Sequence, residues 1–140
     1  MLFVLDTDHF SEFDRGSAAG LRLRERIEAS TEDFFTTVIT IEQVTQGWLA
    51  RLKRCKTARD EIAIYAKLQK SVVEFADWDI LPWDDDAVNV FENLRGQKLR
   101  VGTMDLKIAS IALAYDATVL TRNTVDFAKV PRLRIENWLD

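Results

Sequence analysis

Cysteine, histidine and proline are scarce in this chain of 140 residues, and each shortage argues against a class of structure. Cys55 is the only cysteine, so no internal disulfide forms and a cysteine-based zinc site is disfavoured. His9 is the only histidine, which excludes a histidine-rich metal site. With two prolines and five glycines, the chain has no Gly/Ser/Pro-rich linker. We therefore expect a single domain spanning residues 1–140.

Long hydrophobic runs are absent as well. No window approaches the roughly 18 to 20 consecutive apolar residues of a membrane span. The first residues, MLFVLDTDHF, lack the basic start of a signal peptide, and their apolar run ends at Asp6. The hydrophobic content of 47% is enough for a core that needs no disulfide or zinc to fold. These features predict a soluble, cytoplasmic protein.

The net charge of −4 argues at first against nucleic-acid binding, which usually relies on an excess of Lys and Arg. The basic residues are clustered, however. The clusters are Arg22, Arg24 and Arg26; Arg51, Lys53, Arg54, Lys56 and Arg59; and Lys98 and Arg100. Each cluster alone is typical of a solvated helix face. An acidic protein with basic faces can still bind RNA, especially when cations neutralise its acidic site.

Short apolar runs alternate with longer amphipathic segments. The runs predict strands at residues 2–5, 34–39, 80–81, 118–121 and 133–135. Apolar residues at helical spacing predict helices from about residue 40, over about 57–76, after residue 84 and after residue 103. The order β-α-(α)-β-α-α-β-α-α-β-α-β predicts an α/β sandwich with a mainly parallel sheet of about five strands and helices on both faces.

Four acidic residues adjoin the predicted strands and helices. Asp6 directly follows the first strand, and Asp126 follows the fourth after a short polar segment. Glu42 and Asp105 each fall in the first turn of a helix, for which Thr40 and Thr103 are the predicted caps. In open parallel sheets ligands bind beyond the carboxyl ends of the strands, so we expect the four acids at one rim.

Four carboxylates within a few ångströms would repel one another, and their pKa values would rise unless a cation compensates. Oxygen ligands suit Mg²⁺ or Mn²⁺, and such clusters commonly serve phosphodiester hydrolysis through metal-activated water. Taken singly, Glu42 and Asp105 are better explained by the helix dipole, and Asp126 equally well as a loop acid. Asp6 ends a buried strand, which is costly unless it is paired or metal-bound, so it is the strongest candidate.

Four segments together resemble the PIN-domain nucleases, and within them the VapC-type toxins of bacterial toxin–antitoxin pairs. The segments are LDTDHF at 5–10, ITIEQVTQG at 39–47, VGTMDLKIASIAL at 101–113 and VLTRNTVDF at 119–127. No one of them is diagnostic, but their order and spacing cover essentially the whole chain. The resemblance implies a three-layer PIN-like sandwich and an endoribonuclease that uses Mg²⁺ or Mn²⁺.

The resemblance also implies roles for individual residues. By motif position, the catalytic residues and metal ligands are Asp6, Glu42, Asp105 and Asp126, and the residues that support the site are Thr7, Asp8, Thr121 and Asn123. Relatives often carry Asn or Ser in place of Asp8, which we expect to be the N-cap of the first helix rather than a ligand. Arg100 and Arg122 are our candidates for holding RNA phosphates. The implied partners are an antitoxin protein and a second copy of the chain in a homodimer.

Other functions stay open at this stage. FVLDTD also looks like the opening of a haloacid-dehalogenase-like phosphatase, with Asp6 as nucleophile and Asp8 as acid/base. The chain is short for that family and has no convincing downstream lysine-plus-DD arrangement. A PIN nuclease in RNA processing without a toxin role, or a non-catalytic PIN module, would share the same motifs, although loss of an acid would mark the latter.

Overall fold

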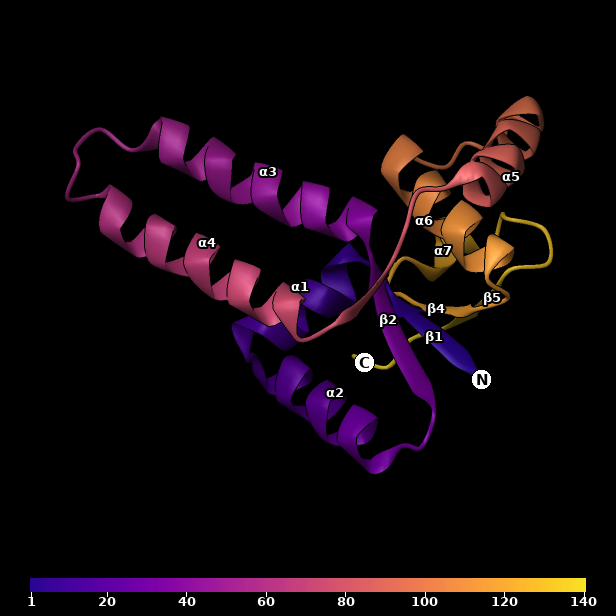
Figure 1. Cartoon of the computed structure of the whole chain (residues 1–140), viewed down its shortest axis with the longest axis horizontal. Coiled ribbons are helices and arrows are strands. Elements are labelled where there is room, and N and C mark those ends of the chain that lie inside the picture. Colours follow the sequence, from indigo (N-terminus) through magenta and orange to yellow (C-terminus); the bar gives the residue numbers. More distant parts are fainter.

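The computed structural model describes all 140 residues, which form a five-stranded parallel sheet in the order β3-β2-β1-β4-β5 (Figure 1). The strands are β1 (Leu2–Leu5), β2 (Asp33–Thr37), β3 (Asp79–Leu81), β4 (Thr118–Leu120) and β5 (Arg134–Glu136). The helices are α1 (Thr7–Arg15), α2 (Ala18–Ala29), α3 (Val38–Arg54), α4 (Glu61–Ala76), α5 (Asp85–Gly96), α6 (Thr103–Ala114) and α7 (Thr124–Phe127). The predicted order of elements and the predicted parallel sheet are both confirmed.

Alternating side chains of the central strand face two different hydrophobic clusters. Val4 packs in the cluster that contains Phe91 of α5 and Leu106 of α6. Phe3 and Leu5 pack in the cluster that contains residues of α1 and α2. Because neighbouring side chains of a strand point to opposite faces, this sheet is covered on both sides. The predicted three-layer α/β sandwich is therefore confirmed.

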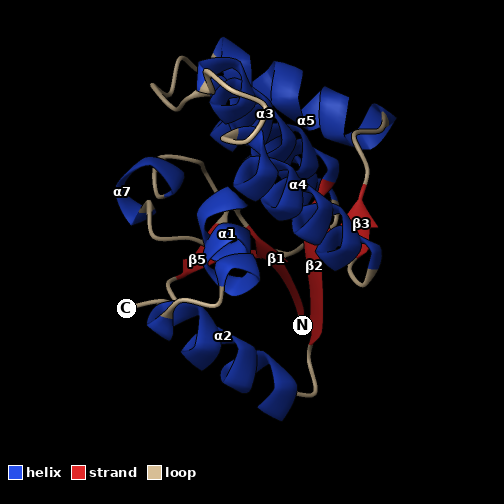
Figure 2. Cartoon of the chain, turned by 90° about the vertical axis from the view of Figure 1, so that its left-hand side faces the viewer, coloured by secondary structure: helices blue, strands red, loops and turns tan.

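Helices α3 and α4 form a hairpin whose outer end extends beyond the sheet (Figures 1 and 2). At its inner end, the ring of Phe75 on α4 stacks on that of Phe10 on α1, with centroids 4.1 Å apart. The hairpin thus packs against α1, the helix that directly follows the central strand. No helix of the chain is both long and apolar enough to cross a membrane.

The second strand is shorter than predicted, because it ends at Thr37 instead of Ile39. The Thr37 hydroxyl accepts a hydrogen bond from the Thr40 N–H at 3.2 Å, so Thr37 caps the helix and the predicted cap at Thr40 is wrong. Val38 and Ile39 have strand-like side chains but lie in the first helical turn, where Ile39 is buried in the core. Capping and tertiary packing override their intrinsic preference.

Two further predicted caps are also wrong. The N-cap of α1 is Asp6 rather than Asp8, because the helix begins directly after the strand, and Asp8 lies in its first turn. The N-cap of α6 is Gly102, with no side-chain capping bond, and Thr103 is the first helical residue. Both errors place a helix start one or two residues too late.

Candidate active site

The carboxyl ends of β1 and β4 meet at the point where the chain changes direction across the sheet. From β1 the chain first builds β2 and β3 on one side, then crosses to β4 and β5 on the other. The Asp6 N–H donates to the Leu120 carbonyl at 3.1 Å, which holds the ends of the two strands together. Such a switch point leaves a crevice between diverging connections, and this is where open α/β sheets bind ligands.

Asp6 lies at this crevice and is almost completely buried, with 3% of its surface exposed. Its Oδ1 accepts a hydrogen bond from the His9 N–H at 2.9 Å, and the His9 Nδ1 lies 3.4 Å from the same oxygen. The His9 Nε2 accepts from the Trp138 N–H at 3.2 Å, so the proton of a neutral ring is on Nδ1 and faces Asp6. His9 is fully buried and ties Asp6 to the C-terminal segment, which does not suit a general base that meets substrate.

Asn123 joins two of the predicted site residues. Its Nδ2 donates to the Oδ2 of Asp105 at 3.2 Å and to the Oδ2 of Asp126 at 3.0 Å. Thr121 holds Asn123 in turn, because the Thr121 hydroxyl accepts a hydrogen bond from the Asn123 N–H at 2.9 Å. Lys129 contacts the other oxygen of Asp126 at 3.0 Å. The start of α6 and the loop after β4 are thereby fixed to each other.

The electrostatics show that negative charge accumulates at the crevice. Burial raises the pKa of Asp105, the hydrogen bond from Asn123 opposes this, and the charges of Asp6, Asp8 and Asp126 raise it further. Burial and then the Asp6 charge raise the pKa of Asp8, although Arg122 opposes both. The pKa of Asp126 is lowered, by Asn123 first and then by Lys129. A cation bound near Asp6 and Asp105 would relieve this repulsion.

Glu42 shares no hydrogen bond or ion pair with the other predicted site residues. It lies one turn beyond the start of α3, outside the predicted first turn, and its side chain is exposed without a hydrogen-bonding partner. The next residue, Gln43, contacts α1: its Oε1 accepts a hydrogen bond from the Thr7 hydroxyl. The Thr7 hydroxyl also lies 3.2 Å from the Thr40 hydroxyl. Adjacent helical residues point about 100° apart, so the Glu42 and Gln43 side chains leave α3 in different directions.

Sequence reasoning missed Gln43 because it looked only for acids. The available signal was the helical spacing: Thr40, Gln43 and Val44 share one face of α3, on which Thr40 is buried. Gln43 therefore brings a neutral amide to the side of α3 that meets Thr7.

The oxygen-rich crevice is better suited to a divalent ion that keeps part of its water shell than to an ion held by protein ligands alone. No three acidic, histidine or cysteine side chains form a group that could hold a metal ion, so the role of the four acids as ligands stays a prediction. Mg²⁺, however, usually keeps several waters and is bound through one or two carboxylates together with substrate phosphates. Asp6 and Asp105, whose charges repel each other, provide such a pair.

The two predicted phosphate-binding arginines have different surroundings. Arg122 forms an ion pair with Asp140 at 3.2 Å and lies 3.5 Å from Glu12, so its charge is already compensated. Arg100 is exposed, and its φ of 58° places its backbone in the left-handed region. Of the two, Arg100 has the freer side chain.

Known proteins resemble this chain at the level of sequence family and of structure. The PIN domain family model matches residues 3–133. Ribonuclease VapC of Rickettsia bellii is 37% identical over 46 residues, and Ribonuclease VapC2 of Rickettsia felis is 44% identical over 45 residues. These matches span 33% and 32% of this chain, and only 34% of the length of each relative.

Similar solved structures extend over nearly the whole chain. The DNA-bound VapBC from Salmonella typhimurium superposes with a TM-score of 0.78 and 25% identity over 99% of both chains. VapBC2 from Rickettsia felis, bound to a DNA fragment from the promoter, gives a TM-score of 0.75 and 22% identity over 99% of both chains. The resemblance inferred from the four sequence segments is confirmed, and the chain belongs to the PIN domain family.

Proposed function

We propose that this protein is a metal-dependent endoribonuclease that hydrolyses RNA phosphodiester bonds at the crevice beyond β1 and β4. The observation that carries the proposal is the gathering of three acids at the switch point of a PIN-family sheet: Asn123 bridges Asp105 and Asp126, and the charge of Asp6 raises the pKa of Asp105. The two relatives named as ribonucleases support the choice of RNA as substrate. Asp6 is buried, and burial and neighbouring carboxylates raise the pKa of Asp105; both features are typical of a site that binds a cation.

In this proposal, Asp6 and Asp105 hold a Mg²⁺ or Mn²⁺ ion. When bound, such an ion lowers the pKa of a coordinated water and stabilises the charge that develops on the phosphate. Asp126 stays ionised because Asn123 and Lys129 lower its pKa, and it orients Asn123 toward Asp105. Thr7 and Gln43 border the crevice on the α3 side. Glu42 is exposed and unpaired, and its predicted role as a further ligand stays a prediction.

The proposed partners follow from the solved relatives. They include a toxin–antitoxin complex from Klebsiella pneumoniae and VapBC-5 from Mycobacterium tuberculosis, a member of the VapBC family of toxin–antitoxin systems. We propose that this chain is the toxin of such a pair, that it forms a homodimer and that it acts in the cytoplasm. Induced expression in growing bacteria should then arrest growth, and co-expression of a small neighbouring gene should restore it. Normal growth at high expression would favour a role in RNA processing.

Cleavage of a mixed pool of structured RNA by the purified protein tests the enzymatic proposal. We expect cleavage in Mg²⁺ or Mn²⁺, none in EDTA, and no hydrolysis of p-nitrophenyl phosphate. RNA cleavage that persists in EDTA would contradict metal dependence. Hydrolysis of the phosphomonoester, with phosphate retained covalently on Asp6, would instead identify a haloacid-dehalogenase-like phosphatase.

A further inference from the structure

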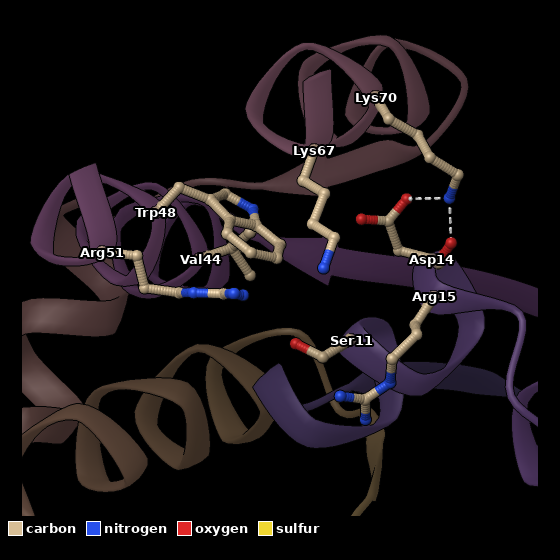
Figure 3. A pocket seen from close by; sticks show the side chains of 8 residues that line it. All are labelled: Ser11, Asp14, Arg15, Val44, Trp48, Arg51, Lys67 and Lys70. Atoms are coloured by element: carbon tan, nitrogen blue, oxygen red, sulfur yellow. Dashed lines mark hydrogen bonds and ion pairs between the residues drawn. The ribbon is translucent and has the colours of Figure 1, made fainter. Parts of the chain in front are cut away.

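A hollow of about 270 Å³ lies between α1, α3 and α4, one helical turn along α1 from the crevice (Figure 3). Its lining residues are Ser11, Asp14, Arg15, Val44, Trp48, Arg51, Lys67 and Lys70. A second hollow continues it toward the crevice, sharing Ser11, Val44, Trp48 and Arg51 and adding Thr7 and Gln43. The two share four lining residues and form one groove that reaches Thr7, the residue after Asp6.

The ring of Trp48 is held in place from behind by a buried chain of hydrogen bonds. Its Nε1 donates to the Ser71 hydroxyl at 3.0 Å, and Ser71 donates to the Oδ2 of Asp14 at 2.7 Å. Ser71 and Asp14 are 1% and 8% exposed, and Lys70 compensates the charge of Asp14 at 3.0 Å. Residues of α1 and α4 thus fix the Trp48 side chain in one orientation, in which it lines the hollow.

The positive charges around this ring are not all compensated. Lys70 is paired with Asp14, and Arg15 is paired with Glu12. Arg51 and Lys67 form no ion pair, and both lie near the Trp48 ring, with the Arg51 Cζ at 5.3 Å and the Lys67 Nζ at 5.8 Å from its centroid. Figure 3 shows both cationic groups pointing into the hollow beside the ring. The chain is acidic overall, so two free cations on one aromatic ring are a local feature.

We propose that this hollow is a subsite for one nucleotide of single-stranded RNA, in which Trp48 stacks on the base while Arg51 and Lys67 bind the flanking phosphates. The inference rests on the proposed ribonuclease function. Stacking on a fixed aromatic ring beside cations is how proteins hold single strands without reading sequence. An acidic peptide could also pair with Arg51 and Lys67, but its carboxylates would leave the Trp48 ring without a stacking partner. The groove runs from this subsite to Thr7, next to Asp6, so an RNA strand bound along it would reach the proposed active site.

Fluorescence anisotropy with a labelled single-stranded 12-mer RNA tests the subsite in EDTA, where cleavage is prevented. The double variant Arg51→Ala/Lys67→Ala should bind roughly tenfold more weakly than the wild type. Its plot of log affinity against log salt should flatten by about 0.7 for each phosphate that the variant no longer binds. The control Lys53→Ala/Lys56→Ala removes the same charge from exposed positions of the same region that line neither hollow, and should bind like the wild type.

The Trp48→Leu variant separates stacking from support of the fold. It should lose roughly tenfold in affinity for the 12-mer but show no weakening on an oligonucleotide whose bases have been removed. Equal weakening on both oligonucleotides would contradict stacking. The exposed Arg51 and Lys67 pair still tests the subsite if the Trp48 variant fails to fold.

The outcomes also separate the subsite from the nuclease activity. Wild-type RNA affinity in the Arg51/Lys67 variant, with metal-dependent cleavage intact, would overturn the subsite alone. Weaker binding of an acidic peptide but not of RNA by that variant would identify the hollow as a protein-binding site and overturn the proposal. Subsite-dependent RNA binding without cleavage in any metal would support the subsite and contradict the proposed enzyme.

Discussion

Asp6 both caps a helix and brings a negative charge to the edge of the sheet. Its Oδ1 satisfies the His9 N–H at the start of α1, so the carboxylate is held by the backbone before any cation binds. The same oxygen lies near the His9 ring, which in turn holds the C-terminal segment through Trp138. A single side chain therefore links the first strand, the first helix and the end of the chain.

The neighbours Glu42 and Gln43 provide a matched pair for testing which face of α3 serves the site. Gln43→Ala removes the acceptor of the Thr7 hydroxyl, and we expect the Mg²⁺ concentration for half-maximal cleavage to rise about tenfold or more. Glu42→Ala should leave it unchanged, because that side chain is exposed and unpaired. A metal titration of cleavage measures both. A larger rise of this Mg²⁺ concentration in Glu42→Ala than in Gln43→Ala would show that the Glu42 carboxylate takes part in metal binding.

Glu12 provides a test of stability against pH. The hydrogen bond from Ser17 lowers its pKa most, and Arg15 and Arg122 lower it further against the effect of burial. Because the folded pKa lies below the ordinary value of 4.5, the stabilisation is fully present above about pH 4.5 and is lost as pH falls through the folded pKa.

We therefore expect Glu12→Gln to lower the free energy of unfolding by roughly 1 to 2 kcal/mol at pH 7. The gap between variant and wild type should close as the pH is lowered below 4.5. Urea denaturation at a series of pH values measures this gap. A gap that stays constant across that range would show that the charge of Glu12 is not what stabilises the fold.

At the scale of elements, α1 and α2 approach each other more closely than a side chain allows. A Cβ built on Gly20 would lie 1.9 Å from the backbone oxygen of Glu12. Ser17 caps α2 directly before this contact, and its hydroxyl accepts from the Gly20 N–H at 3.0 Å. The tight turn between the two helices thus depends on one residue without a side chain.

Replacing this glycine should separate the two helices. Gly20→Ala is expected to lower the free energy of unfolding by about 3 kcal/mol or more, because the added carbon meets backbone that cannot rotate away. Gly47→Ala is the control: its Cβ would meet nothing within 4 Å, and Ala is favoured over Gly inside a helix by about 1 kcal/mol. Thermal melts of both variants should therefore shift in opposite directions. Similar melting temperatures for the two would contradict the close approach.

The pattern of apolar residues predicted where most elements lie, but not where α1, α3 and α6 begin. Strand and helix preferences are averages over several residues, whereas a helix start depends on one cap. Thr37 is the cap of α3, although it lies inside the aromatic and β-branched run that indicated a strand. This error of a few residues placed Glu42 in a first turn, whereas it lies one turn further along α3.

At the scale of the whole molecule, the site is assembled from distant parts of the sequence. Asp6 directly follows the first strand, Asp105 lies in α6 and Asp126 in α7, and only the parallel order of the sheet brings them to one edge. Order and spacing of motifs could predict this convergence, because parallel strands share their carboxyl edge. They could not predict that Asn123 bridges two of the acids, which depends on the path of the loop after β4. We propose that residues 1–140 act as one nuclease domain.

Repulsion among these acids should couple metal binding to the stability of the whole chain. At a free Mg²⁺ concentration ten times the Kd, binding should add about 1.4 kcal/mol to the free energy of unfolding and raise the melting temperature. Without metal, Asp105→Asn should melt higher than the wild type, because burial and neighbouring carboxylates disfavour its charged form. The variant should then gain little from Mg²⁺. An equal gain in both proteins would place the ion elsewhere.

Cleavage of RNA by Asp6→Asn, measured beside the wild type in the same metal, tests the central claim most directly. Asn is as good an N-cap as Asp and nearly the same size, so α1 should stay folded and the melting temperature should be unchanged or higher. We expect the folded variant to lose metal-dependent cleavage entirely. Cleavage at the wild-type rate by the folded, pure variant would show that Asp6 does not carry the reaction.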